Sequence, residues 1–122
     1  MPYTIHQWPG SVQKDEIETL PLDASIAVLV MLRRMRVAGP FPEEYNVKAL
    51  PRENHGLRQV NLRINGEQIR VLFSVYQTKI VVLHVFKKTS PQIEKRGYEK
   101  ARDRKKTVET FLKGGTDVPT IH

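Results

Sequence analysis

Residues 57–89 alternate between apolar and polar side chains, a pattern that predicts three successive β-strands. Asn65-Gly66 lies between the first two strands and favours a two-residue hairpin turn, because both central positions of such a turn take positive φ. The turn predicts a register in which Asn61 faces Arg70, with Arg63 on the same face as Arg70. The opposite face is expected to be apolar and to consist of Val60, Leu62, Ile64, Ile69, Val71, Phe73 and Val75.

The third strand is predicted at Lys79–Lys88. If Gln77-Thr78 forms a tight turn, Lys87 shares the face of Arg70, and Lys88 lies on the other face. A longer turn exchanges the two lysines, so one of them joins the arginines in either case. Like charges gathered on one face repel, and a bound anion would relieve that repulsion. The alternative is an ordinary solvated sheet face.

The segment before the sheet is predicted to be mainly helical. Residues 3–8 form a short strand, and Ser11 can cap a short helix that reaches Leu20. Asp23 is the expected N-cap of a longer helix that ends at Gly39-Pro40, and residues 41–55 form a loop. The long helix is expected to pack on the sheet through Ile26, Leu29, Val30, Leu32 and Met35. Its last turns carry Arg33, Arg34 and Arg36, which suit the helix dipole and are assigned no site.

After the sheet, Ser90 and Pro91 mark the start of a helix that runs to about Leu112. The expected organisation is a single domain over residues 1–113 with a flexible tail at 114–122. The fold class is α+β: a small, mostly antiparallel sheet of about four strands, two N-terminal helices packed on it, and a basic C-terminal helix. That helix carries the cations Lys95, Arg96, Lys100, Arg102, Arg104, Lys105 and Lys106, which predict either a solvated salt-bridged surface or phosphate contact.

The net charge of +7 is unevenly distributed over the 122 residues. Residues 1–56 hold six Lys and Arg against seven Asp and Glu, whereas residues 57–122 hold fourteen against six. The positive excess therefore lies on the sheet and the C-terminal helix, which favours contact with a polyanion such as nucleic acid. The chain has no cysteine, no apolar run of transmembrane length and no secretory signal pattern, so a cytoplasmic protein without membrane contact is expected.

Familiar catalytic motifs are missing from the sequence. The four histidines lack metal-ligand spacing, His84 is expected to be a structural residue of a strand, and no phosphate-binding loop or nucleophile elbow occurs. Neither a metal nor a cofactor is expected. What remains is a cationic site, which can catalyse RNA cleavage by 2′-hydroxyl attack through electrostatic stabilisation of the scissile phosphate. A general base would be a shifted lysine, a tyrosine or a group outside the protein.

Four local motifs together resemble the RelE/HigB superfamily of toxins of type II toxin–antitoxin systems, and in particular its phage-derived HigB-like branch. These motifs are Gly56-Leu57 leading to Leu62-Arg63, Ile69-Arg70-Val71-Leu72, the segment Val82–Thr89 with Phe86-Lys87-Lys88, and the basic helix Tyr98–Arg104. The resemblance covers about residues 12–112 and implies a RelE-like fold. The family commonly has Glu where this chain has Asn61, a carboxylate that would either pair with Arg70 or take part in proton transfer.

The resemblance implies an mRNA endonuclease that acts on the translating ribosome and is neutralised by a helix-turn-helix antitoxin. Carried over by position, the catalytic residues would be Arg63, Arg70 and Lys87 or Lys88. Ribosomal RNA would be held by Lys95, Arg96, Lys100, Arg102 and Arg104. Two other functions remain open: a non-catalytic nucleic-acid-binding module, and an inactive toxin that only binds an antitoxin. Steep salt dependence without cleavage would favour the binding module.

Overall fold

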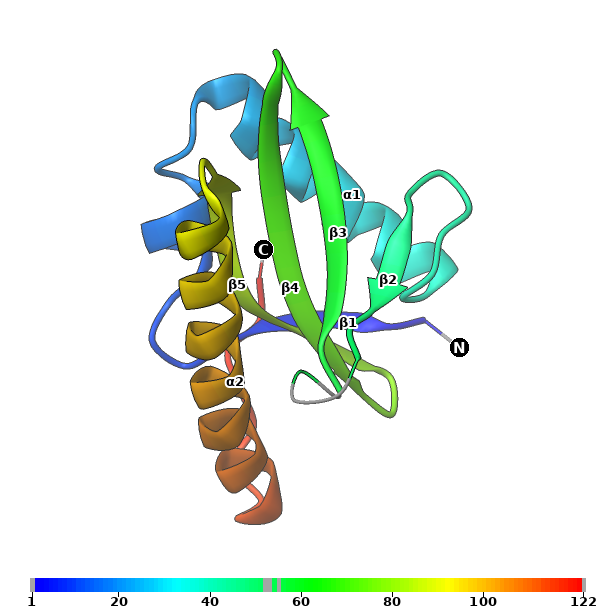
Figure 1. Cartoon of the computed structure of the whole chain (residues 1–122). Coiled ribbons are helices and arrows are strands. Elements are labelled where there is room, and N and C mark those ends of the chain that lie inside the picture. The colour runs from blue at the N-terminus through cyan, green and yellow to red at the C-terminus, as the bar shows by residue number, and fades with distance from the viewer. Residues whose placement is uncertain (1, 52–53, 55, 122) are drawn as a thin grey trace.

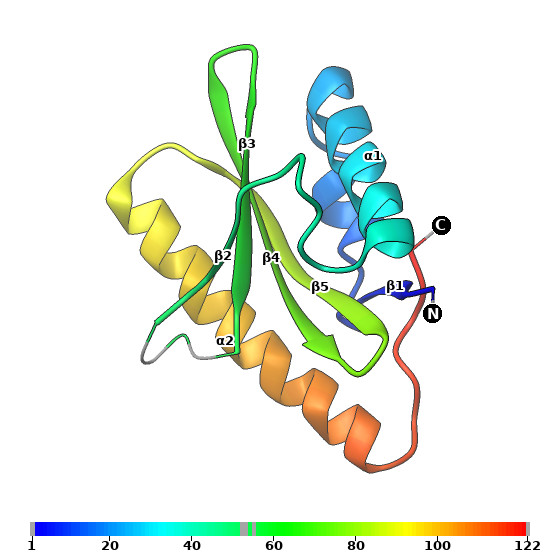
Figure 2. The same ribbon diagram turned by 90° about the vertical axis from the view of Figure 1, so that its right-hand side faces the viewer.

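The computed structural model describes residues 2–51, 54 and 56–121, and shows a five-stranded sheet between two helical layers (Figures 1 and 2). His55 and His122, at the ends of the expected loop and tail, lie outside the described residues. The strands are β1 (Thr4–Gln7), β2 (Val47–Ala49), β3 (Arg58–Ile64), β4 (Glu67–Tyr76) and β5 (Lys79–Lys88). The helices are η1 (Gln13–Ile17), α1 (Leu22–Ala38) and α2 (Pro91–Lys113). The α+β class is confirmed.

The sheet has the order β1-β5-β4-β3-β2, and it is antiparallel except for the parallel pair β1 and β5. The predicted hairpin register is confirmed, because Asn61 faces Arg70 and the turn residues Asn65 and Gly66 have φ of 51° and 80°. The sequence predicted about four strands. The additional strand β2 pairs with the edge of β3 inside the segment that was expected to be a loop.

The two faces of the sheet are covered by different helices (Figure 2). On one face α1 and η1 pack on the predicted apolar side chains of β3 and β4, including Val60, Leu62 and Val71. On the other face α2 packs through Ala101 and Val108 on a second cluster, which includes Leu72, Val81 and Leu83. The close approach of α2 explains a glycine within it: a Cβ at Gly97 would lie 2.5 Å from the ring of Phe86.

The helices differ in detail from their predicted bounds. The short first helix is a single π-helical turn, η1, and α1 begins at Leu22 after Pro21, so Asp23 lies inside the helix and is not its cap. The expected apolar face of α1 is also partly wrong, because Ile26 and Val30 are each 52% exposed. The buried positions of α1 are Ala24, Ser25, Val28, Met31, Leu32 and Met35. The start of α2 is as predicted, with the Ser90 side chain accepting a hydrogen bond from the Ile93 N–H.

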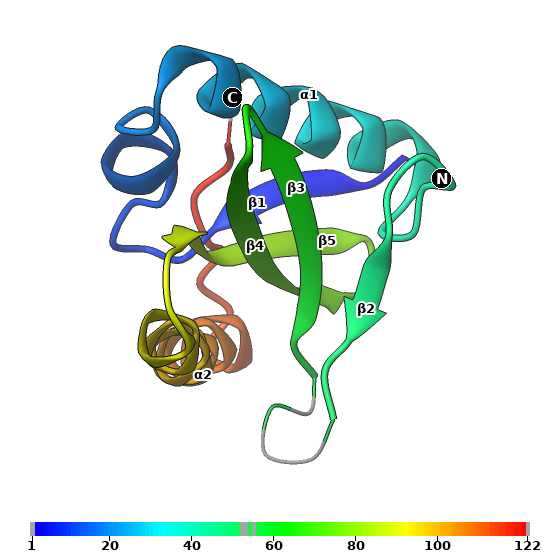
Figure 3. The same ribbon diagram turned by 45° about the horizontal axis from the view of Figure 1, so that its top comes forward.

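The segment after α2, expected to be a flexible tail, lies along β1 (Figure 3). The backbone N–H of Ile121 donates to the carbonyl of Ile5, and the N–H of Gln7 donates to the carbonyl of Pro119. Val118 is buried in the α2 cluster, and Lys79 pairs with Asp117 at 2.8 Å. These contacts hold the segment against the outer edge of the sheet. No helix in the described part of the chain is long and apolar enough to cross a membrane.

Candidate functional site: a cationic face beside the N-terminus of α2

An irregularity in β5 decides which lysine lies beside Arg70. Gln77-Thr78 is a tight turn, one of the two possibilities that the sequence left open, since Tyr76 pairs with Lys79. The register then shifts between Leu72 and Phe73, which places one extra residue of β5 in the ladder. Side chains beyond this bulge change face. Arg70 consequently pairs with Phe86, and Lys88, not Lys87, shares its face.

The site face consists of two neighbouring rows across β3, β4 and β5. The outer row is Arg63, Gln68 and Lys88, and the next row is Asn61, Arg70 and Phe86. Lys87 lies on the opposite face, where its ammonium contacts Glu67 at 3.2 Å. The structure therefore brings together Arg63, Arg70 and Lys88 from the predicted catalytic set, and it separates Lys87 from them.

Arg70 is the most enclosed cation of this face, with a side chain that is only 12% exposed. Its Nη2 lies 2.6 Å from the carboxylate of Glu94, and the same carboxylate is 3.9 Å from the ammonium of Lys88. The Nε of Arg70 is buried and has no hydrogen-bond partner among the described residues. Since a buried donor without a partner is costly, this atom is available to an acceptor that enters the site.

Glu94 was not predicted as a site residue, because its sequence position suggests only a solvated helix surface. It lies in the first turn of α2, which Ser90 caps, so the helix start sets its position. Asn61 stands where the resembled family commonly has Glu, and a carboxylate nevertheless contacts Arg70. It comes from a different element of the fold.

Tyr98 lies one helical turn after Glu94 and donates a hydrogen bond from its hydroxyl to Oε1 of Gln59 at 2.7 Å. Burial and then the negative charge of Glu94 raise the pKa of Tyr98, while Arg70 opposes the shift. The phenol therefore stays protonated at neutral pH, so it can donate a hydrogen bond but is a poor general base.

Two small pockets flank this arrangement. One, of about 130 Å³, is lined by Asn46, Lys48, Gln59, Asn61 and Arg70. The other, of about 170 Å³, is lined by Asn54, Pro91, Glu94, Lys95, Tyr98, Glu99 and Arg102. Lys48 is a further cation that sequence reasoning missed, because it lies in β2 within the expected loop. Pairing of β2 with β3 brings it to the pocket beside Arg70.

The predicted RNA-binding cations of α2 divide into three groups. Lys95, Arg96 and Lys100 are exposed. Arg102 is half-buried and donates to the Asn54 side chain. Arg104 departs from the expectation of an RNA contact, because its side chain is 12% exposed and turns inward to the Glu16 carboxylate at 2.6 Å. Its guanidinium also stacks over Trp8, 4.1 Å from the ring centroid.

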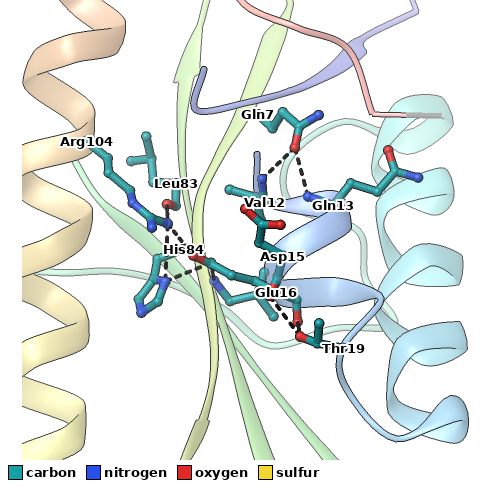
Figure 4. A network of polar contacts seen from close by, with 10 residues as sticks. Gln7, Val12, Gln13, Asp15, Glu16, Thr19, Leu83, His84 and Arg104 are labelled. Carbon is teal, nitrogen blue, oxygen red and sulfur yellow. Dashed lines mark hydrogen bonds and ion pairs between the residues drawn. The ribbon is translucent and has the colours of Figure 1, made fainter. Parts of the chain in front are cut away.

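Arg104 belongs to a buried polar network that joins η1, β5 and α2 (Figure 4). The Glu16 carboxylate contacts Nδ1 of His84 and accepts from the Val85 N–H, each at 2.8 Å, and Arg104 also donates to the Leu83 carbonyl. His84 is thus a structural residue, as the sequence indicated. Among the residues that the structure describes, no group of three or more His, Cys, Asp or Glu side chains is arranged to hold a metal.

Two comparisons place the chain among known proteins. Residues 15–106 match the model of the family described as Phage derived protein Gp49-like (DUF891). A chain of the crystal structure of the toxin–antitoxin complex RelBE2 from Mycobacterium tuberculosis shares the fold, with a TM-score of 0.52 and 22% sequence identity, over 72% of this chain and 100% of that one. A search of the curated proteins gave no match. The family match extends over three quarters of the sequence, from η1 into the second half of α2, and the chain therefore belongs to the phage-derived Gp49-like family.

Proposed function

We propose that this chain is the toxin of a type II toxin–antitoxin system, and that it is an endoribonuclease that cleaves mRNA on the ribosome. The observation that carries the proposal is the enclosed Arg70, whose buried Nε lacks a partner in the described structure and which lies beside Lys88 and Arg63. Membership of the Gp49-like family and the fold shared with a chain of a toxin–antitoxin complex support the same assignment.

The proposed reaction is attack of the RNA 2′-hydroxyl on the adjacent phosphorus. The 2′-hydroxyl gives up its proton to a group outside the protein, such as water or an RNA group at the ribosome, as the new O–P bond forms a cyclic phosphate. The bond to the 5′-oxygen breaks, and that oxygen takes up a proton from water. Negative charge grows on the phosphate oxygens during the attack. Arg70, Lys88 and Arg63 would stabilise this charge, and preorganised donors of this kind contribute roughly 10²–10³ each to a rate.

Substrate binding would rearrange the ion pair between Arg70 and Glu94. The Glu94 carboxylate contacts Arg70 and Lys88, the cations that would bind a phosphate. An incoming phosphate must therefore displace this carboxylate or share the two cations with it. The protonated hydroxyl of Tyr98 can donate a hydrogen bond, but it cannot readily take the 2′-hydroxyl proton. Because the site is poor in bases, a nuclease of this design needs an RNA that the ribosome holds in a reactive geometry.

The proposal includes a protein partner and a location. The partner would be a helix-turn-helix antitoxin that keeps the toxin inactive, and the place of action would be the cytoplasm, where messages are translated. The three exposed cations of α2, Lys95, Arg96 and Lys100, would contact the phosphates of ribosomal RNA. Arg102 would add to this surface from the neighbouring pocket.

The test is inducible expression of the chain alone in a bacterium, with growth measured and cut sites in translated messages mapped by primer extension. We expect growth arrest and cuts inside coding regions, both abolished in Arg70→Ala. Arg70→Lys keeps the charge but not the buried Nε, so it should retain only a small part of the activity. Arg34→Ala removes an exposed arginine of α1 and serves as the matched control.

A second candidate is an RNA-binding protein that does not cleave, favoured by Asn61 in place of the family carboxylate and by the protonated Tyr98. Normal growth and intact messages from a soluble, folded chain that binds RNA would establish this candidate instead. If a folded Arg70→Ala protein arrested growth as the unchanged chain does, the assignment of the site would be wrong. Thermal unfolding of each purified variant shows whether it is folded.

A further inference from the structure

Helix α1 is apolar on two sides, and only one side faces the sheet. The buried side enters the core through residues such as Val28, Met31 and Met35. On the outer side Leu22 is 72% exposed, Ile26 and Val30 are each 52% exposed, and Val37 is 74% exposed. Leu22, Ile26 and Val30 follow at intervals of four residues, so they form one stripe along the helix.

Exposed apolar side chains are concentrated at this one place in the fold. Among the described residues, the large hydrophobic side chains that are exposed all belong to α1 or, in the case of Phe41, to the segment directly after it. Figure 3 shows α1 at the outside of the molecule, with no element packed over its outer side. An apolar patch of this kind on a small protein typically marks an interaction surface.

The same outer side is positively charged. Arg33 and Arg36 follow Leu29 at intervals of four and seven residues, and both line a recess of about 480 Å³ together with Ile5, Leu29, Leu32 and Ile121. Neither arginine has an ion-pair partner in the described part of the chain. Of the acidic residues that flank α1 in the sequence, Asp23 accepts a hydrogen bond from Asn65 at 2.7 Å and Glu44 pairs with Arg34. Glu43 is exposed and forms no ion pair with either arginine among the described residues.

From this combination we propose that the outer side of α1 binds an acidic amphipathic helix of a partner protein. The exposed apolar positions of α1, from Leu22 to Val37, span about 22 Å at the usual helical rise, which matches the contact length of a helix of four turns. The partner's apolar residues would cover Leu22, Ile26 and Val30, and its carboxylates would pair with Arg33 and Arg36. The site face lies on the other side of the sheet, so the proposal does not rest on RNA cleavage.

The charge of the surface argues against two other occupants. In a symmetric dimer across this helix, Arg33 and Arg36 would approach the same arginines of the second copy and repel them. A nucleic acid would satisfy the arginines but would leave the apolar stripe uncovered. A partner that carries both apolar and acidic side chains complements both features.

The test uses two synthetic 18-residue helical peptides with leucines at the same heptad positions. One carries glutamate at the flanking positions and the other carries lysine. We expect the acidic peptide to shift the backbone amide NMR signals of residues 22–41 in the full chain and to bind at least about tenfold more tightly than the basic one. The double variant Arg33→Glu, Arg36→Glu should reverse this preference, and Ile26→Ser with Val30→Ser should weaken both peptides.

The matched control is Lys95→Glu with Arg96→Glu, which reverses two exposed cations of α2 and should leave binding of the acidic peptide at α1 unchanged. Signals that shift only in α2 and the site face would overturn the proposal. Equal affinity of the acidic peptide for the unchanged chain and for the Arg33→Glu, Arg36→Glu variant would also overturn it. A dimer in solution that Ile26→Ser dissociates, or vesicle binding that the same change abolishes, would assign the surface to a second copy or to a membrane instead.

Discussion

At the scale of single residues, Glu16 links three elements that are far apart in the sequence. Its carboxylate bonds to His84 and Val85 in β5 and to Arg104 in α2, with a side chain that is only 12% exposed. These bonds lie at the bulge of β5, which brings Lys88 to the site face. They also attach α2, the helix that carries Glu94, to β5. The network therefore supports the geometry of the site, although no hydrogen bond or ion pair in the described part of the chain joins Glu16, His84 or Arg104 to the site cations.

Glu16→Gln is expected to lower the free energy of unfolding by about 3–5 kcal/mol at neutral pH, since it leaves the enclosed Arg104 without its counter-charge. Burial opposes ionisation of Glu16, but bonds from His84, Val85 and Arg104 outweigh it and lower the pKa below the ordinary value of 4.5. Because the pKa of Glu16 is lower in the folded state, its ionised carboxylate stabilises the folded protein at pH values above the pKa of the unfolded state. This stabilisation is lost as the pH falls through the pKa of the folded state.

Urea unfolding of the two proteins at a series of pH values tests this prediction. The difference between them should be full at pH 7 and should shrink progressively below about pH 4.5. Glu18→Gln is the matched control, because Glu18 is exposed and lies two residues away in the same segment. A stability difference that is equally large at every pH would contradict the role given to the Glu16 charge.

At the scale of elements, the strand β5 shows where prediction from local sequence stops. The Asn65-Gly66 turn follows from a dipeptide whose backbone preferences are local, so the register of β3 and β4 could be predicted, whereas a tight turn at Gln77-Thr78 was only one of two possibilities. The bulge beside Leu83 has no such signal, because it depends on how β5 meets β4 and the polar network under α2. The choice between Lys87 and Lys88 therefore required the structure.

The bulge makes Lys87 and Lys88 a matched pair of neighbours with opposite environments. We expect Lys88→Ala to lower the rate of ribosome-dependent mRNA cleavage at least about tenfold, since it removes a cation from the developing phosphate charge. Lys87→Ala should change the rate by less than about twofold, because Lys87 pairs with Glu67 on the far face, a surface ion pair of little energetic consequence. Equal effects, or a larger effect of Lys87→Ala, would contradict the observed register as the basis of the site.

The sequence predicted that helix α1 forms, but not which of its sides faces the sheet. Apolar residues occur on both its sides, so periodicity alone could not separate the buried Val28 and Met31 from the exposed Ile26 and Val30. The short strand β2 was missed because three residues have little pattern, and it forms only where the edge of β3 offers a partner. Contacts between distant segments decided both features.

At the scale of the whole molecule, the fold divides the cations of residues 57–122 into exposed and enclosed side chains. Residue order alone could not distinguish Arg104 from its neighbours on the basic helix, since only the position of α2 on the sheet turns that side chain toward Glu16. Lys95, Arg96 and Lys100 remain exposed at the end of α2 that carries Glu94 and Tyr98. These exposed cations lie on the same turns of α2 as Glu94, whose carboxylate contacts Arg70 and Lys88 of the sheet face.

If these three cations contact phosphates, replacing all three with alanine should weaken binding of single-stranded RNA irrespective of its sequence. Each phosphate contact contributes about 0.7 to the slope of log affinity against log salt concentration for single strands, so the slope should fall by about 2. Fluorescence anisotropy at a series of salt concentrations measures both quantities. The matched control replaces Lys14, Arg33 and Arg34, three exposed cations that do not lie in α2, and should leave the slope unchanged. A slope that falls equally in both triple variants would mean that RNA affinity depends only on the net charge of the protein. In that case the cations of α2 would contribute no more to RNA binding than cations elsewhere on the surface.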